Sequence, residues 1–341
     1  MACDPVIVER PQTWGVLRYN MLNHSFSFSE NKQRSADPYA IGPVVLNIVI
    51  SQRCNMDCEY CVARDFTGIE KEDLVLSTEM IEWIRKSTFM LVVLTGGEPL
   101  MSPASFTTMR IVESISDRGI MIDTNGTILP NREVLSTLKR NRVMLRVSMD
   151  SVSAHEEIRL RRVRKGQELD SSSAFNIKLS NIDRFLSAGI STAIQTVVYQ
   201  NNEDSLNKMI DWLCLHGIKR WYLQRLIPSN RYNPIRTLKP EDYYPLVKRI
   251  AGKARSKGIE CVPKMDLRHN SVFLLTADGA LYTQGEAPGQ KVRLGTIREQ
   301  IEYFDYVSAA DHACRYYLAD SPKEESGRFG IKAATHGAKR K

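Results

Sequence analysis

The chain alternates short apolar runs with segments of helical periodicity, and this alternation constrains its fold more than any other feature. Six β-rich runs, each followed by turn residues, lie at 44–51, 89–95, 119–124, 142–149, 191–199 and 219–227. Segments with helical spacing follow them at 80–86, 103–118, 131–139, 174–188, 204–216 and 240–257. Because right-handed crossovers place successive strands side by side, the repeat predicts a parallel sheet. The predicted fold class is α/β, a partial (β/α)6 TIM-like barrel.

The pattern changes after about residue 258. Short β-rich segments are predicted at 260–263, 271–275 and 280–283, with Ala277-Asp278-Gly279 as a hairpin turn. These segments predict a small C-terminal α+β extension. The expected division of the chain is an N-terminal extension at 1–41, a core barrel at 42–232, a C-terminal region at 233–320 and a basic tail at 321–341.

The charge of the chain is unevenly distributed. Its formal net charge is +8, and residues 323–341 hold six Lys or Arg and two Glu, which is half of that charge. We expect this tail to be disordered and solvated, and a nucleic-acid contact is the alternative. A second basic run at 159–165 contains no aromatic residues, so it does not predict a platform on which bases stack.

The distribution of apolar residues argues against a membrane protein. No apolar run approaches the ~20 residues that a membrane-spanning helix needs. The first residues carry acidic side chains and lack the apolar stretch of a secretory signal. A hydrophobic content of 43% is nevertheless too high for a disordered chain. We therefore expect a folded cytoplasmic protein without a membrane partner.

Three of the seven cysteines stand close together, directly after the first predicted strand. Cys54, Cys58 and Cys61 have the spacing C-x3-C-x2-C, and the remaining four are scattered at 3, 214, 261 and 314. Three thiolates on one tight loop can bind three irons of a cubane cluster and leave the fourth iron open. A zinc site would need a fourth ligand at short range, which the loop lacks. The spacing predicts an iron–sulfur cluster rather than a disulfide framework.

This cysteine pattern, with Tyr60 before the last cysteine, resembles the hallmark of the radical S-adenosylmethionine (SAM) superfamily. The resemblance extends over about 44–227. It implies a [4Fe–4S] cluster with Cys54, Cys58 and Cys61 as its metal ligands. It also implies that SAM chelates the open iron and is cleaved reductively to methionine and a 5′-deoxyadenosyl radical, which abstracts hydrogen from a substrate. Tyr60 matches the aromatic position near the adenine.

Two further strand ends fit the same resemblance. Thr95-Gly96-Gly97-Glu98-Pro99 resembles the GGEP motif, in which the family binds the amino group of SAM, so Gly96, Gly97 and Glu98 are candidate cofactor contacts. Glycines there let the backbone approach a ligand. Thr124-Asn125-Gly126-Thr127 resembles the family's TNG segment, which either lines the ligand pocket or forms a plain turn.

The later strand ends supply weaker candidates. Ser148, in Val147-Ser148-Met149-Asp150-Ser151, resembles the serine that contacts the SAM ribose or carboxylate. Arg159 matches the arginine of a following H-(D/E)-x-x-R stretch that pairs with the SAM carboxylate in some branches, and Arg161 is the alternative. Candidates for side chains that point into the barrel are Gln195 and Thr196 on the fifth predicted strand and Gln224 and Arg225 on the sixth.

The resemblance narrows to the clade that contains the molybdopterin GTP cyclase, the sulfatase maturases, peptide-modifying enzymes and viperin. Residues 276–284 and 294–297 resemble the hairpin of auxiliary-cluster domains, but Gln284 stands where that pattern has cysteine. Cys261 and Cys314 are the thiols that remain nearby, and two thiols do not hold a second cubane. We therefore predict a single cluster, with Cys261 and Cys314 as core thiols.

The sequence thus predicts a single-cluster radical SAM enzyme. Its substrate is a peptide, a nucleotide or a small metabolite, and its electron donor is a protein such as flavodoxin or ferredoxin. No catalytic residue is assigned. Three alternatives stay open: a viperin-like nucleotide-modifying enzyme, a non-catalytic iron–sulfur or SAM-binding protein whose basic tail contacts nucleic acid, and an electron-transfer or zinc protein.

Overall fold

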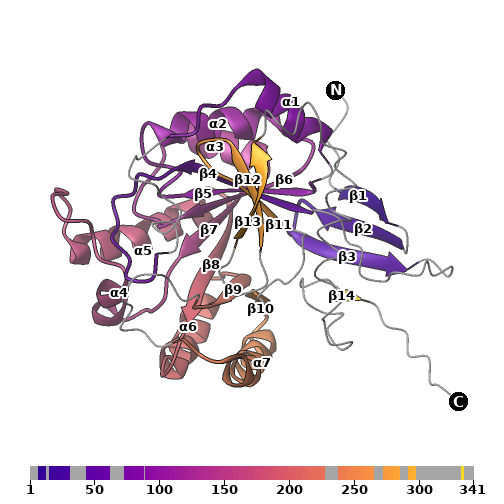
Figure 1. Ribbon diagram of the computed structural model, residues 1–341. Helices are drawn as coiled ribbons and strands as arrows, with labels where there is room; N and C mark the ends of the chain where they lie inside the picture. The colour runs from indigo at the N-terminus through magenta and orange to yellow at the C-terminus, as the bar shows by residue number, and fades with distance from the viewer. Residues whose placement is uncertain are drawn as a thin grey trace, which may run out of the picture.

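A ten-stranded sheet forms the centre of the molecule (Figure 1). The computed structural model describes residues 7–12, 15–30, 44–61, 73–87, 89–226, 237–264, 272–284, 291–296 and 332–333. The six strands predicted for the barrel are β4 (Val45–Ser51), β5 (Leu91–Gly96), β6 (Gly119–Thr124), β7 (Met144–Ser148), β8 (Ser191–Val198) and β9 (Arg220–Arg225). They lie side by side in chain order, and every neighbouring pair is parallel. The predicted α/β class and parallel strand order are confirmed.

Helices follow the strands along the chain. They are α1 (Thr78–Lys86), α2 (Ala104–Ser114), α3 (Arg132–Arg140), α4 (Ala154–Leu160), α5 (Ser171–Ser187), α6 (Glu203–Leu215) and α7 (Pro240–Ser256). Three of them begin at side-chain caps, in which Ser77, Asn131 and Asp170 accept hydrogen bonds from backbone N–H groups of the first turn. The caps of α1 and α3 lie within three residues of the predicted starts at 80 and 131, whereas α5 begins three residues before its predicted start at 174.

Several predicted boundaries are wrong, for local reasons. The strand predicted from residue 142 begins only at Met144, because Arg142 has a positive φ of 53° that a strand does not accommodate. The helix predicted at 103–118 ends at Ser114, since the backbone of Ile115 is no longer helical. Helix α4 was not predicted, because the residues 154–160 form less than two turns of apolar periodicity.

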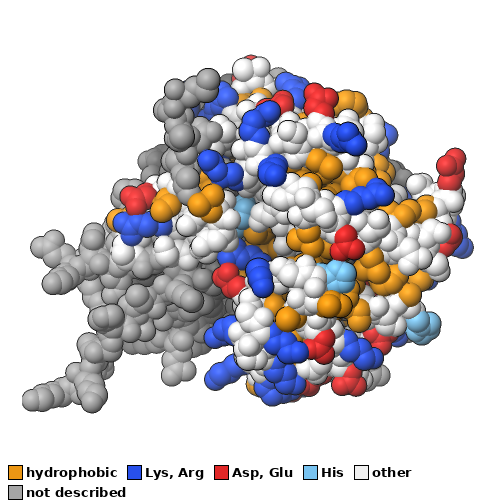
Figure 2. Space-filling model, turned by 180° about the vertical axis from the view of Figure 1, so that it is seen from behind, with side chains coloured by type: hydrophobic (Ala, Val, Ile, Leu, Met, Phe, Trp, Pro, Cys, Tyr) orange, Lys and Arg blue, Asp and Glu red, His pale blue; other side chains and the backbone are white. Residues whose placement is uncertain are grey.

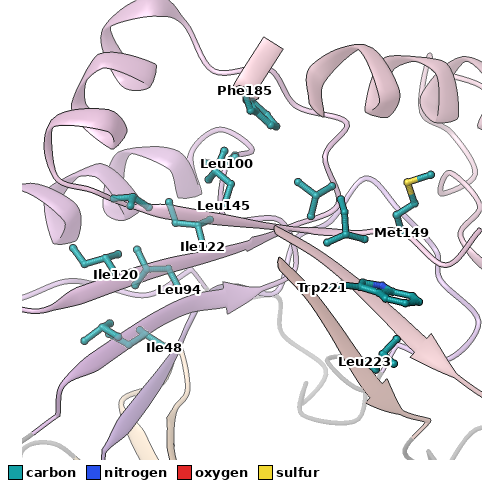
Figure 3. Close-up of a cluster of buried hydrophobic side chains, with 14 of the residues drawn as sticks. Ile48, Leu94, Leu100, Ile120, Ile122, Leu145, Met149, Phe185, Trp221 and Leu223 are labelled. Carbon is teal, nitrogen blue, oxygen red and sulfur yellow. The ribbon is translucent and has the colours of Figure 1, made fainter. Parts of the chain in front are cut away.

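The hydrophobic core lies between the sheet and its covering helices (Figure 3). Alternate residues of the strands point outward into it, as Ile48, Leu94, Ile122 and Leu145 do. Phe185 of α5 contributes to the same cluster from the helical layer. Cys261 is also buried in this core, as predicted for a core thiol, whereas Cys314 lies outside the described residues.

The N-terminal extension, to which the sequence assigned no structure, forms an antiparallel sheet. Its strands are β1 (Ile7–Gln12), β2 (Gly15–Asn20) and β3 (Ser25–Glu30), and β14 (Lys332–Ala333) pairs parallel with β3. Tyr19 of β2 lies against Gly119, the first residue of β6, and packs in one cluster with Met121, Met144 and Tyr222 from inside the barrel. The β2–β3 hairpin therefore closes the amino end of the barrel, which we call the barrel floor. Apart from β14, the predicted disordered tail lies outside the described residues.

The C-terminal strands extend the same sheet at both edges. β10 (Glu260–Lys264) pairs parallel with β9, and β11 (Val272–Leu275) pairs parallel with β4. β12 (Ala280–Gln284) and β13 (Lys291–Thr296) continue antiparallel from β11, and the predicted turn at Ala277-Asp278-Gly279 joins β11 to β12. Residues 297–331, which include Cys314, lie outside the part of the chain that the structure describes.

Neither a membrane-spanning helix nor a uniformly basic face is seen in the described parts of the surface. Within the described ranges, no helix has the length and apolar character needed to cross a membrane. On the face seen in Figure 2, Lys and Arg side chains are interspersed with acidic and hydrophobic ones. The described part of this face therefore offers no separate support for a nucleic-acid contact.

Candidate functional site

The three cysteines lie on the loop that follows β4, which we call the cysteine loop (residues 52–61). All three cysteine residues are partly exposed, and none of them forms a disulfide. Burial raises the pKa of the Cys54 thiol to about 12, and Glu98, Cys58 and Cys61 add to that rise. Burial also raises the pKa of Cys58 to about 11, with a contribution from Cys61. Because Cys58 and Cys61 both act on the pKa of Cys54, the three sulfur atoms share one local environment.

A strand-like ladder fixes the cysteine loop to the chain after α4. The Asp57 N–H donates to the carbonyl of Arg162 at 2.7 Å, and the Arg164 N–H donates to the carbonyl of Asn55 at 2.9 Å. The Glu59 N–H donates to the carbonyl of Leu160 at 3.0 Å. Segment 160–164 therefore holds the middle of the cysteine loop through its backbone, independently of side chains.

The glycine pair after β5 holds the start of the cysteine loop by close backbone contact. The Gly97 N–H donates to the carbonyl of Ser51 at 2.6 Å, and the Glu98 N–H donates to the carbonyl of Arg53 at 2.8 Å. A Cβ on Gly97 would lie 1.9 Å from the Arg53 oxygen. Gly96 has a φ of 128°, and a Cβ there would lie 2.3 Å from the Ser51 oxygen. These glycines are thus needed for packing, whether or not they also contact SAM as predicted.

The Glu98 side chain is fully buried and accepts three hydrogen bonds. Its Oε1 accepts from the Thr124 hydroxyl at 2.8 Å and from the Leu100 N–H at 3.1 Å. Its Oε2 accepts from the Asn125 N–H at 2.7 Å. Burial raises the pKa of Glu98 to about 7, although these donors oppose the rise. Glu98 therefore links the ends of β5 and β6, and its predicted contact with the SAM amino group stays a prediction.

The TNG segment contacts the cysteine loop directly. The Asn125 amide donates to Asn55 Oδ1 at 2.8 Å and approaches Cys54 Sγ at 3.8 Å. In return, the Asn55 amide donates to the Thr127 hydroxyl at 2.8 Å. The Met56 N–H also donates to Cys54 Sγ, at 3.4 Å. The two N–H groups directed at the sulfur of Cys54 are therefore both neutral.

A buried network of charges lies beneath Cys58. Asp150, at the end of the V-S-M-D segment, accepts from the Tyr60 hydroxyl, from Arg161 Nε at 2.7 Å and from the Val197 N–H at 2.8 Å. The Arg161 guanidinium lies over the Tyr60 ring at 5.2 Å and reaches Cys58 Sγ at 3.9 Å. Tyr60, predicted to lie near adenine, is thus held by its hydroxyl.

The network extends to α4 and α5. Glu157 Oε2 accepts from the backbone N–H groups of Asp150 at 2.8 Å and Ser151 at 3.1 Å. Its other oxygen pairs with Lys178 and lies 3.8 Å from Arg161 Nε. Two buried acids thus face two buried bases, which lowers the cost of burying each charge.

The remaining predicted residues lie in different surroundings. Ser148 ends β7 opposite Gln195 of β8, whose buried Oε1 has no hydrogen-bond partner among the described atoms. Arg159 is exposed on α4, where it opposes the rise that burial causes in the pKa of Tyr199, whereas Arg161 is buried beside Cys58. The structure therefore brings Arg161, and not Arg159, to the cysteine loop.

Sequence reasoning missed two members of the buried network, Glu157 and Lys178. Lys178 stands among the buried positions 174, 175, 181, 182 and 185 of α5, so a lysine on an apolar helical face was the available signal. Glu157 offered no comparable signal, because two glutamates are adjacent in the first turn of α4 and one of them, Glu156, is partly exposed.

The donor set fits an iron–sulfur cluster better than a single metal ion. In the described residues, no group of three His, Cys, Asp or Glu side chains is arranged to hold one metal ion. A cubane places each thiolate on a different iron, so its ligands are spread more widely than those of a single ion. Three thiols lie on one clamped loop, and N–H donors are directed at Cys54 and Cys58, as is usual around thiolate ligands of a metal centre.

Comparison with known proteins agrees with this site. The family model of the Radical SAM superfamily matches residues 48–213, from β4 to α6. This region of the chain belongs to the radical SAM superfamily. Membership implies a [4Fe–4S] cluster and SAM as cofactors.

Among relatives by sequence are the GTP 3',8-cyclases. That of Bradyrhizobium diazoefficiens is 29% identical over 192 residues, which cover 53% of this chain and 52% of the relative. That of Synechocystis is 27% identical over 184 residues, covering 52% and 51%. The chain thus spans about half the length of the relatives that it matches.

Solved structures share the fold over more of the chain. Streptococcus suis SuiB bound to S-adenosylmethionine has a TM-score of 0.68 at 11% identity, covering 94% of this chain and 91% of SuiB. Native anSMEcpe with bound AdoMet has a TM-score of 0.60 at 17% identity, covering 81% and 84%. At these identities the likeness concerns the fold.

Proposed function

We propose that the protein is a radical SAM enzyme with a single [4Fe–4S] cluster held by Cys54, Cys58 and Cys61. The observation that carries this proposal is the cysteine loop itself. Its three thiols share one environment, and hydrogen bonds hold the loop between the glycine pair after β5 and segment 160–164. When bound, the cluster supplies the electron that splits SAM into methionine and a 5′-deoxyadenosyl radical.

The residues around the loop bind and orient SAM in this proposal. Gly96, Gly97 and Glu98 lie where β5 ends and are proposed to receive the amino group. Ser148, at the end of β7, is proposed to contact the ribose or the carboxylate. Tyr60 is proposed to lie near the adenine, and its bond to Asp150 fixes the ring in place. Arg159 is the proposed carboxylate partner by its place in the motif, and Arg161, which lies at the cysteine loop, is the alternative.

The sequence relatives and the structural neighbours differ in the class of substrate that their names indicate. The sequence relatives are named for a nucleotide substrate, GTP. Two of the structural neighbours contain peptides, SuiB with its precursor peptide SuiA and anSMEcpe with the Kp18Cys peptide. We propose a peptide, nucleotide or small metabolite as substrate, and flavodoxin or ferredoxin as the electron donor. A non-catalytic protein that binds the cluster and SAM, with nucleic acid bound to the basic tail, is the alternative.

The test is SAM cleavage by the reconstituted protein. We expect the protein, loaded anaerobically with iron and sulfide and reduced with dithionite, to convert SAM into 5′-deoxyadenosine. The Cys54→Ala, Cys58→Ala, Cys61→Ala triple variant is the matched control and should form none. Pools of peptides, nucleotides and metabolites are then screened for substrates that increase the yield or exchange deuterium with the product. A cluster retained by the triple variant would refute the assignment, and a loaded wild type that never cleaves SAM with any pool would favour the binding-protein alternative.

A further inference from the structure

Arg161 places a permanent positive charge beside one of the three cysteine sulfurs. Its Nη1 lies 3.9 Å from Cys58 Sγ, and its side chain is only 7% exposed. Asp150 fixes the guanidinium at 2.7 Å through Nε, and the Tyr60 ring lies against it at 5.2 Å. Because the group is buried and held on two sides, its charge is screened little by water.

The surroundings of Cys54 differ in charge. The donors directed at its sulfur are the Met56 N–H at 3.4 Å and the Asn125 amide at 3.8 Å, which are both neutral. The charged group that acts on Cys54 most is an acid, Glu98, which raises the pKa of the thiol. The field across the cysteine loop is therefore uneven, with positive potential at Cys58.

Acidic groups pair with Arg161, but Arg161 is the member of the network that reaches the sulfur of Cys58. Asp150 pairs with Arg161 directly, and Glu157 approaches Nε at 3.8 Å. Glu157, however, is itself paired with Lys178. Two acids and two bases leave the network neutral as a whole, with its positive end turned toward the sulfur of Cys58.

We propose that Arg161 raises the reduction potential of the [4Fe–4S] cluster by stabilising the thiolate of Cys58. The inference rests on the proposed function, since it requires a cluster on the three cysteines. One-electron reduction adds one negative charge to the cluster, and a nearby buried cation stabilises the reduced form more than the oxidised form. Arg161 acts through Cys58 and is thus a positioning residue.

The proposal is tested by the potential of the cluster, without SAM and without substrate. Wild type and variants are loaded with iron and sulfide and titrated anaerobically with dithionite, and the reduced cluster is followed by its electron paramagnetic resonance signal. Arg161→Gln should shift the midpoint potential to more negative values. Arg161→Lys keeps a charge and should shift it less. Asp150→Asn removes the anion that offsets Arg161 and should shift the potential in the opposite direction.

Arg162→Gln is the matched control. Arg162 is adjacent, exposed and paired with Glu59 on the loop at 2.8 Å, so its removal should leave the potential within the error of the wild type. A loaded Arg161→Gln variant with the potential of the wild type overturns the proposal. If the Arg161→Gln variant does not assemble a cluster, the Asp150→Asn variant provides the test. An unchanged or more negative reduction potential in Asp150→Asn overturns the proposal.

The two proposals fail in different ways. A potential that follows the expected order in a protein that never cleaves SAM contradicts the proposed function alone. SAM cleavage with no difference in potential between Arg161→Gln and Arg162→Gln contradicts the role of Arg161 alone. Failure of the wild type to assemble a cluster on the three cysteines contradicts both.

Discussion

The two ends of the barrel use buried polar groups for opposite purposes. At the barrel floor, the Tyr19 hydroxyl bonds His24 Nδ1 at 2.8 Å, and Arg220 bonds the carbonyl of His24 and the Glu260 carboxylate. These groups pair with one another and close the barrel. At the carboxyl end, Glu98, Asn125 and segment 160–164 bond the backbone and side chains of a loop.

The two ends of the barrel differ in what their polar contacts hold in place. Polar contacts at the floor join the N-terminal β2–β3 hairpin to the barrel strands, as expected of a stabilising end. Contacts at the carboxyl end fix the cysteine loop while its three thiols remain outside any disulfide. A change at the carboxyl end should therefore affect cofactor chemistry first, whereas a change at the floor should affect stability first.

Loss of a cysteine from the trio is expected to have the largest effect. Cys54→Ala, Cys58→Ala or Cys61→Ala should abolish the iron–sulfur absorption and the formation of 5′-deoxyadenosine, because each iron ligand is a thiolate. Absorption spectra and iron analysis after anaerobic reconstitution measure the loss. Cys261→Ala is the control, since Cys261 is buried in the core at β10 and should keep the absorption. Loss of the cluster in that variant alone would show that the ligands were misassigned.

Gly97→Ala tests whether SAM cleavage depends on the position of the cysteine loop when the three cysteines themselves are unchanged. The added Cβ would lie 1.9 Å from the Arg53 oxygen and 2.4 Å from the Arg53 carbonyl carbon, so the cysteine loop must shift. A misplacement of about 1 Å can lower reaction rates by about 100-fold in other enzymes, and we expect a comparable fall in SAM cleavage.

Gly252→Ala is the matched control for this glycine. Gly252 lies in α7, and a Cβ there meets nothing within 4 Å. The change should raise the free energy of unfolding by roughly 0.5–1 kcal/mol, through helix propensity, and leave SAM cleavage intact. Equal SAM cleavage by both variants would contradict the packing role of Gly97.

Glu98→Gln tests whether the buried acid holds the two strand ends together. A glutamine has one oxygen where Glu98 uses two, so one of its three donors loses an acceptor. The free energy of unfolding in urea should fall by about 2 kcal/mol. Glu113→Gln, on the exposed side of α2, should change it by less than about 0.5 kcal/mol. An unchanged free energy of unfolding would contradict the structural role of Glu98, and weaker SAM binding in the same variant would support its proposed contact with the amino group.

The sequence predicted the barrel because its signals are local. Caps such as Ser77 and Asn131 and the alternation of β4 to β9 lie within single elements. The contacts of the buried network were not predictable, because Asp150, Arg161 and Lys178 meet only after three elements fold together, even though Arg161 was a candidate and Lys178 stood on an apolar helical face. The N-terminal sheet was missed for the same reason, since the partner of Tyr19 is a glycine one hundred residues away.

Gly119→Ala is the counterpart of Gly97→Ala at the barrel floor. The new Cβ would lie 2.0 Å from the ring of Tyr19, which is fully buried and has no room to retreat. Overpacking of this kind typically costs 1–3 kcal/mol, so we expect a loss of about 2 kcal/mol in the free energy of unfolding. The cluster absorption should be unchanged. Tyr19→Leu combined with Gly119→Ala should recover part of the loss, and a failure to do so would place the strain elsewhere.

His24 gives the floor a dependence on pH. Burial, with Arg220 nearby, lowers the pKa of His24 from 6.5 to about 3. Between these pH values the unfolded chain binds a proton at His24 that the folded chain does not bind. Protonation of His24 therefore does not lower the free energy of unfolding above pH 6.5, and it lowers this free energy progressively as the pH falls towards 3. At pH 5.5 the loss is about 1.4 kcal/mol. His24→Asn suits the φ of 51° and should remove this loss, measured as the free energy of unfolding at pH 7.5 and 5.5. The exposed His155→Gln variant should keep it, and an equal pH dependence in all three proteins would show that the floor does not exclude the proton.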